Sequence, residues 1–119
     1  MDSEATLENL KSQIKTFCSE RDWDQFHPPK DLAIGISTEA NELLDLFRFK
    51  TDSEIEQKFS DLEFKNKVKH ELADVFFFIL RFAQKNNIDL SSALKEKMQL
   101  NADKYPVEKS KGSNKKYNE

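Results

Sequence analysis

The fold of this chain is decided by residues 68–83, which read VKHELADVFFFILRFA. Apolar side chains recur there at every third or fourth position, and this spacing predicts an amphipathic helix, which we extend to residues 64–86. Phe76, Phe77 and Phe78 are consecutive, so on a helix their side chains point about 100° apart and cannot all reach one core. We therefore expect a second apolar contact surface and a homo-oligomer.

Helix signals continue on both sides of this stretch. The segment His27-Pro28-Pro29 cannot continue a helix, so it separates the first helix from the second. Ser53-x-x-Glu56 is typical of a capping box and predicts a short connecting helix. Asp89 is an N-cap candidate, and Tyr105-Pro106 ends the last helix. We expect long helices at residues 3–21, 31–49, 64–86 and 90–104.

These elements predict an all-α fold, most simply a four-helix bundle with a short connecting helix. No stretch shows the alternation of polar and apolar residues that a strand would require. We expect one domain at residues 1–107. Residues 108–119 are polar and rich in Lys, so they are expected to form a flexible C-terminal tail.

Charge is distributed unevenly along the chain. The formal net charge is −3, but residues 95–119 hold seven Lys against four acids, so the remainder carries the acidic excess. This pattern does not suit nucleic-acid binding and does suit a small polyanion. Cys18 is the single cysteine, which excludes an internal disulfide and fits a cytoplasmic protein. No stretch has the length and apolar character of a signal peptide or a membrane span.

Two pairs of carboxylates stand at i,i+3 spacing on the expected helices: Glu39 with Glu42, and Glu71 with Asp74. Side chains three residues apart share a helix face, and repulsion between like charges costs roughly 0.2–0.5 kcal/mol per pair. Lys67 is the single Lys or Arg one turn away from any of them. A solvated surface is the alternative explanation for either pair alone. Two pairs beside strongly apolar faces favour an acidic cluster that binds a cation.

Oxygen ligands select a hard cation, and Mg²⁺ is the usual one where the substrate is a phosphate. A di-iron bundle would need Glu-x-x-His motifs, but neither His27 nor His70 stands three residues after a glutamate. The sequence also lacks the acidic loop of an EF-hand, a Gly-rich phosphate loop and a Ser-His-Asp arrangement. Metal-assisted hydrolysis is therefore the expected reaction class. A metal-bound water or one of the acids could start it, and the sequence leaves both open.

The acidic motifs lie among longer strings that resemble a known family. These strings are Arg21-Asp22-Trp23-Asp24-Gln25-Phe26-His27, Glu39-Ala40-Asn41-Glu42-Leu43, Phe47-Arg48-Phe49-Lys50, Lys97-Met98, Asn101, Lys104-Tyr105-Pro106-Val107 and Ser110-Lys111-Gly112-Ser113. Together with Glu71-x-x-Asp74 they resemble the MazG-like all-α nucleoside triphosphate pyrophosphohydrolases, and among these the dCTP pyrophosphatase branch. The resemblance covers residues 7–117, nearly the whole chain.

The resemblance implies a house-cleaning enzyme that uses Mg²⁺ to cleave dCTP or modified dCTP between the α and β phosphates, releasing the monophosphate and pyrophosphate. It also implies dimers that pair into tetramers, with sites built across subunits. The implied metal ligands and catalytic residues are Glu39, Glu42, Glu71 and Asp74. The implied substrate contacts are Trp23 and Phe49 for the base, and Lys97, Asn101, Lys104 and Tyr105 for phosphate or sugar.

Two positions depart from the family pattern and bear on base preference. Relatives more often carry Trp at the position of Phe49 and a polar His at the position of Ile14. Trp23 and Phe49 could equally serve as apolar anchors of the fold, and the lysines of the last helix could be solvated. The alternative function is a non-catalytic helical module that binds Mg²⁺–nucleotide or mediates oligomerisation.

Overall fold

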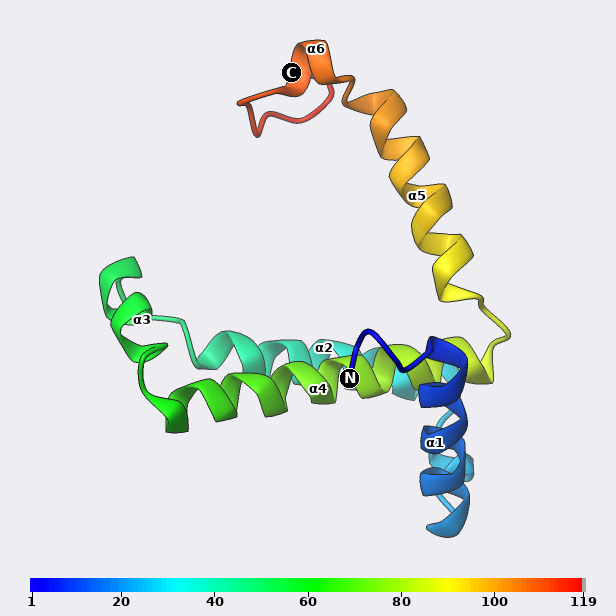
Figure 1. The fold of residues 1–119 in the computed structure, drawn as a ribbon. Coiled ribbons are helices and arrows are strands. Elements are labelled where there is room, and N and C mark those ends of the chain that lie inside the picture. Colours follow the sequence, from blue (N-terminus) through cyan, green and yellow to red (C-terminus); the bar gives the residue numbers. More distant parts are fainter. Residues whose placement is uncertain (119) are drawn as a thin grey trace. The chain divides into compact units, whose positions relative to one another are not determined.

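The computed structural model of the protein describes residues 1–118, and these are all-α, as the sequence predicts (Figure 1). The elements are α1 (Leu7–Glu20), the 3₁₀ helix η1 (Asp24–Phe26), α2 (Pro29–Asp45), α3 (Asp52–Lys58), α4 (Leu62–Lys85), α5 (Leu90–Lys104) and α6 (Val107–Ser110). The four long helices and the short connecting helix α3 correspond to the predicted elements. The chain divides into two compact units, Met1–Asn87 and Ile88–Glu119.

The predicted boundary between a domain of residues 1–107 and a tail of residues 108–119 stays a prediction. The expected tail begins inside α6, a helix of four residues that the sequence did not indicate. The predicted tail also includes Glu119, which lies outside the described residues. None of the described helices has the length and apolar character needed to cross a membrane.

Capping side chains explain where α1, α3, α4 and α5 begin. At the start of α1, Thr6 Oγ1 accepts a hydrogen bond from the amide of Asn9 (3.0 Å). At the start of α5, Asp89 Oδ2 accepts one from the amide of Ser92 (3.0 Å), which confirms the predicted cap. Each oxygen satisfies an amide that has no partner within its own helix.

The cap of α3 differs from the prediction. Thr51 Oγ1 accepts from the amide of Glu54 (3.2 Å), so the helix begins at Asp52. The proposed box Ser53-x-x-Glu56 is therefore wrong. Thr51-x-x-Glu54 has the same pattern two residues earlier, and a capping motif alone does not distinguish overlapping candidates.

Helix α2 is displaced toward the N-terminus relative to its predicted range of 31–49. Pro29 occupies its first turn, where the missing N–H removes no helical hydrogen bond. The helix ends at Asp45, and Phe49 has left helical geometry altogether, with φ of +64°. Residues 46–49 are mostly apolar and suggest that the helix continues, which explains why its predicted end lies beyond Asp45.

Helices α2 and α4 lie side by side and antiparallel in the first unit (Figure 1). Gly35 of α2 makes their close approach possible. A Cβ atom at this position would lie 2.6 Å from Cδ1 and Cε1 of the Phe78 ring. Carbon atoms normally pack about 3.5–4.0 Å apart, so any larger residue at position 35 would displace the ring or the helix.

The three consecutive phenylalanines face three directions. Phe78 covers Gly35, and Phe77 packs edge-on against Phe17 of α1 with ring centroids 6.1 Å apart. Phe76 is 41% exposed, and Leu72, one turn earlier, is 55% exposed. One chain therefore does not bury all three rings, as the sequence predicts. A second copy that covers Phe76 stays a prediction.

A buried cation joins η1 to the C-terminal end of α4. Arg81 is 2% exposed, and its guanidinium donates to His27 Nδ1 (3.0 Å), Gln84 Oε1 (2.9 Å) and Asp24 Oδ1 (2.9 Å). Lys85 Nζ donates to the same Asp24 oxygen (2.7 Å). These bonds compensate the cost of removing the guanidinium from water. They also hold residues 24–27 against α4.

Replacing Gly35 with Ala should lower the free energy of unfolding. Alanine favours a helix over glycine by about 1 kcal/mol. Overpacking against the Phe78 ring typically costs 1–3 kcal/mol, so we expect a net loss of up to about 2 kcal/mol in urea denaturation. In a Phe78→Leu background the same change should be neutral or stabilising. Stabilisation by Gly35→Ala in the native background would contradict this account.

The stability contributed by His27 should decrease as the pH falls below about 6.5. Its Nδ1 accepts from Arg81, so the ring is neutral, and burial lowers its pKa, helped by the charges of Arg81 and Lys85 and opposed by Asp24. The unfolded chain then binds a proton that the folded chain does not, so acid favours unfolding. Urea denaturation at pH 7.5 and 5.5 should show a larger loss for wild type than for His27→Gln. Equal losses would refute the assignment.

Candidate functional site

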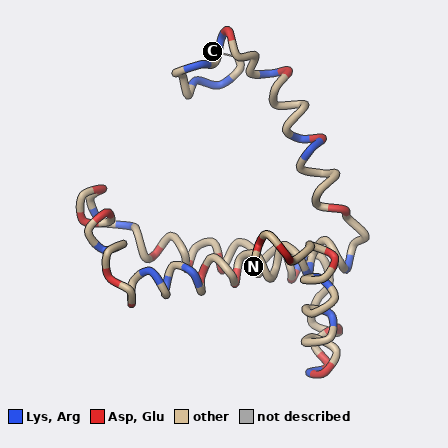
Figure 2. Tube along the Cα trace, viewed as in Figure 1, with Lys and Arg blue, Asp and Glu red and all other residues tan. Residues whose placement is uncertain are grey.

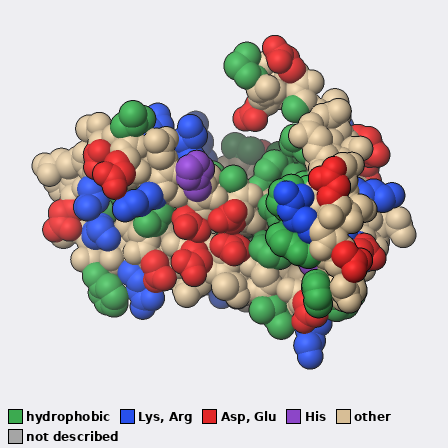
Figure 3. Space-filling model, turned by 90° about the horizontal axis from the view of Figure 1, so that it is seen from below, with side chains coloured by type: hydrophobic (Ala, Val, Ile, Leu, Met, Phe, Trp, Pro, Cys, Tyr) green, Lys and Arg blue, Asp and Glu red, His purple; other side chains and the backbone are tan. Residues whose placement is uncertain are grey.

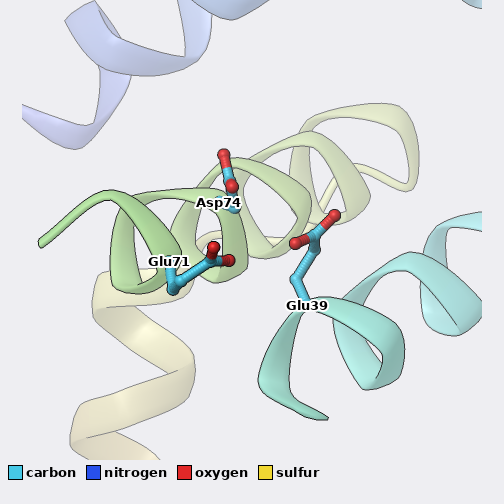
Figure 4. Close-up of side chains that lie close together, drawn as sticks. All are labelled: Glu39, Glu71 and Asp74. Atoms are coloured by element: carbon cyan, nitrogen blue, oxygen red, sulfur yellow. The ribbon is translucent and has the colours of Figure 1, made fainter. Parts of the chain in front are cut away.

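Glu39 of α2 and Glu71 and Asp74 of α4 point toward a common space between the two helices (Figure 4). One carboxylate oxygen of each lies within 4.8 Å of the other two. Glu71 and Asp74 share a face because they are three residues apart on a helix. Gly35 lies one turn before Glu39, so the close approach of α2 to α4 brings this third carboxylate into place. Three of the four predicted metal ligands therefore meet within one chain.

Glu42 is the fourth predicted ligand, and it is exposed and lies outside this group of three. Its charge still acts on Glu39, although more weakly than those of Asp74 and Glu71. Acidic side chains gather in a patch on the face shown in Figure 3. The single chain thus places Glu42 near the group without bringing its carboxylate into it.

The three carboxylates repel one another. The pKa of the half-buried Glu39 carboxyl is raised, mainly by burial and further by the charges of Asp74 and Glu71. Among residues 1–118, no Lys or Arg forms an ion pair with any of the predicted metal ligands. A cation in the common space would relieve this repulsion.

The donor set fits a hard divalent cation such as Mg²⁺. The group of three offers carboxylate oxygens and contains neither His nor Cys. His27 is unavailable to it because its Nδ1 accepts the bond from Arg81. Mg²⁺ usually binds one or two carboxylates together with waters and substrate phosphates, so three carboxylates suffice. The predicted preference for Mg²⁺ over iron agrees with these donors, and the identity of the metal stays a prediction.

An apolar groove of about 380 Å³ lies between α1 and α4. Ile14, Phe17, Ala73 and Phe77 are among its lining residues, and Ala73 directly precedes Asp74. Trp23, which is 40% exposed, packs edge-on against Phe17 with centroids 5.6 Å apart. The predicted base contact Trp23 thus packs on a residue that lines the groove without lining it itself, and Ile14 makes this space less polar than a His would.

Phe49 is brought to the surface and away from the core. Its side chain is 93% exposed, and its ring carries the guanidinium of Arg48 4.9 Å from the centroid. Its φ of +64° is costly for an aromatic residue. The apolar-anchor explanation for Phe49 is therefore wrong within the single chain, whereas its predicted contact with a base stays a prediction.

The remaining predicted contacts belong to the second unit. Lys97 and Asn101 are exposed on α5. Lys104 ends that helix, and Tyr105 follows as its C-cap, with its amide donating to the carbonyl of Asn101 (2.8 Å). Lys104 and Tyr105 line a polar pocket together with residues of the C-terminal segment. The excess of Lys in residues 95–119 indicated a small polyanion, but the sequence did not indicate which of these lysines line one pocket.

Comparison with known proteins identifies the family. A family model described as MazG-like matches residues 34–119, a range that contains both carboxylate pairs. The chain belongs to the MazG-like family. The family resemblance read from the sequence motifs is thereby confirmed.

Named relatives of this MazG-like chain share nearly its whole length. The dCTP pyrophosphatase 1 of Rattus norvegicus is 36% identical over 114 residues, which cover 96% of this chain and 67% of the relative. The dCTP pyrophosphatase 1 of Homo sapiens is 37% identical over 117 residues, covering 98% and 68%. The crystal structure of a pyrophosphatase from Archaeoglobus fulgidus superposes with a TM-score of 0.77 at 35% identity, covering 84% of this chain and 92% of that one. The similarity to the dCTP pyrophosphatase branch is also confirmed.

The stability of Glu71→Gln, compared in EDTA and in Mg²⁺, should distinguish the repulsion among the acids from their binding of a cation. In EDTA the variant should be at least as stable as wild type, because one of three repelling charges is removed. Saturating Mg²⁺ should stabilise wild type, by about 2.7 kcal/mol at one hundred times the dissociation constant, and leave the variant nearly unchanged. Thermal denaturation with and without Mg²⁺ measures both effects. Glu56→Gln on α3 is the charge-matched control and should respond to Mg²⁺ as wild type does.

Proposed function

We propose that this MazG-like protein is a Mg²⁺-dependent nucleoside triphosphate pyrophosphatase that cleaves dCTP or modified dCTP between the α and β phosphates. The products are the nucleoside monophosphate and pyrophosphate. The observation that carries the proposal is the group formed by Glu39, Glu71 and Asp74. It occurs in a chain that is 36% and 38% identical to the dCTP pyrophosphatases 1 of Rattus norvegicus and Bos taurus.

In this proposal Glu39, Glu71 and Asp74 hold the cation, and Glu42 completes the acidic site from the next turn of α2. Bound Mg²⁺ would neutralise the phosphate chain and lower the pKa of a water molecule that attacks phosphorus. The chain's task is to hold the acids in place and to exclude other ligands. Gly35 helps to hold the acids in place, because it allows α2 to lie close to α4.

The apolar groove that Phe17 helps to line is the proposed site of the base, with Trp23 as a contact next to Phe17. Trp23 precedes α2 and Phe49 follows it, so the proposed contact of Phe49 with the same base would come from a second copy of the chain. Flat apolar walls suit a nucleobase because an aromatic ring and a base can stack. Ile14 in place of a polar His removes one hydrogen-bonding group from this wall, so we expect weaker discrimination among bases than a polar residue would give. In the second unit, Lys97, Asn101, Lys104 and Tyr105 are the proposed contacts to phosphate or sugar.

We further propose a homo-oligomer, a dimer or a tetramer, and a cytoplasmic location. The exposed Phe76 and Leu72 support an apolar interface between copies, since contiguous apolar surface usually marks an interaction site. Cys18 is fully buried, and burial raises the pKa of its thiol. It is therefore a core residue, and its retention as a free thiol fits a reducing compartment.

The experiment that tests the activity is pyrophosphate release from a panel of canonical and 5-substituted (deoxy)nucleoside triphosphates, with Mg²⁺ and with EDTA. We expect Mg²⁺-dependent release that is greatest for dCTP or a 5-substituted dCTP. Release spread evenly over all bases would retain the reaction and reject the cytosine preference. Nucleotide binding without any release would reject the enzyme and favour a non-catalytic Mg²⁺–nucleotide module.

Glu39→Gln and Asp74→Asn should each reduce turnover by about 10²-fold or more, because each removes an anionic ligand while leaving the shape of the side chain. The variants should keep the helical circular dichroism of wild type. Glu56→Gln removes the same charge far from the site and should retain wild-type activity. Full activity in Glu39→Gln would show that the metal site is assigned to the wrong residues.

A further inference from the structure

The C-terminal segment closes on itself within the second unit. The ring of Tyr117 packs edge-on against that of Tyr105, with centroids 6.1 Å apart. Lys104 Nζ lies 5.0 Å from the centroid of the same Tyr117 ring. These contacts join the two ends of residues 104–117, which we call the Lys loop. The segment therefore folds back on the end of α5, although most of its residues are exposed.

A specific turn reverses the direction of the Lys loop. The amide of Ser113 donates to the carbonyl of Ser110 (3.0 Å). Between them, Lys111 has φ −60° and ψ 121°, and Gly112 has φ +78°. These angles are those of a type II β-turn, in which the third residue needs positive φ and is therefore usually glycine. No heavy atom lies within 4 Å of a Cβ built on Gly112, so backbone conformation and not space requires glycine here.

The Lys loop lines a partly open polar pocket of about 390 Å³. Four of its lining residues are lysines (Lys104, Lys109, Lys115 and Lys116), and two more are serines (Ser110 and Ser113). No acidic residue is among the described residues that line it. Basic residues are correspondingly dense at the C-terminal end of the trace (Figure 2).

This lining is suited to an anion with several oxygen atoms. Residues 104–117 contain five Lys and one acid, Glu108, so this segment carries an excess of positive charge. Lysines bind phosphate as point charges, and serine hydroxyls can donate to the same oxygens. The volume lies within the roughly 300–1,000 Å³ of sites for small molecules. A pocket of this size fits a short phosphate chain better than the extended backbone of a nucleic acid, which needs a continuous basic surface.

We propose that the Lys loop is a binding site for a di- or triphosphate chain, built by the turn at Gly112 and closed by Tyr105 and Tyr117. The chain can belong to the nucleoside triphosphate substrate or to free pyrophosphate, and the assignment of either source rests on the proposed function. Binding of the phosphate chain itself does not depend on catalysis.

Calorimetric titration of the full-length protein with inorganic tripolyphosphate in EDTA tests the site, because EDTA removes any metal bridge to the acidic group. We expect Lys109→Gln/Lys115→Gln to weaken binding about tenfold or more, as expected for losing charge-assisted contacts. Lys95→Gln/Lys111→Gln is the matched control. It removes the same charge from α5 and from the turn, at residues that do not line the pocket, and should bind within about twofold of wild type.

Gly112→Val distinguishes a built pocket from a merely basic segment. It retains every lysine but places a β-branched residue at positive φ, which should open the turn and weaken tripolyphosphate binding about tenfold. Binding equal to wild type in Gly112→Val, or equal losses in both double variants, would overturn the proposal. Failure of wild-type protein to bind tripolyphosphate would overturn it as well.

Kinetics with Mg²⁺ then identify the source of the phosphate chain. A higher KM for dCTP in Lys109→Gln/Lys115→Gln would assign the chain to the substrate. Weaker inhibition by pyrophosphate at an unchanged KM would assign it to the product. Calorimetry requires no turnover, so an inactive wild-type protein would reject the proposed function while leaving the test of the Lys loop intact.

Discussion

The contact between Gly35 and the Phe78 ring is the constraint on which the first unit depends. It permits α2 and α4 to approach so closely that Glu39 meets Glu71 and Asp74, although no attraction among these acids favours their meeting. Apolar packing thus supplies the free energy that offsets electrostatic repulsion. The three carboxylates are held together by the packing of the helices, which agrees with the preorganised cation site that the proposed function requires.

A second constraint is polar and acts at the other end of α4. Arg81 holds Asp24 and His27, so the segment that follows Trp23 is tied to the same helix that carries two of the acids. The packing of Gly35 on Phe78 and the hydrogen bonds of Arg81 therefore both involve α4. The segment next to Trp23 is thus positioned by hydrogen bonds, and the acidic group by apolar packing.

The two units carry clusters of opposite charge. The first presents carboxylates that suit a cation, and the second presents ammonium groups that suit phosphate. A nucleoside triphosphate with its Mg²⁺ contains both complementary charges, so the distribution of charge along the chain agrees with the proposed function. Membership of the MazG-like family supports the same conclusion from independent information.

The sequence alone determined the existence of the four long helices, the capping role of Asp89 and the spacing of the two carboxylate pairs, because each depends on residues within one or two turns of each other. It could not reveal the Arg81–Asp24 bond, which joins positions 57 residues apart, or the reason for Gly35, which appears only when Phe78 faces it. It also misplaced the cap of α3, where two local motifs overlap. Only tertiary structure decided that three of the four acids converge, since spacing along a helix gives direction but not which helix lies opposite.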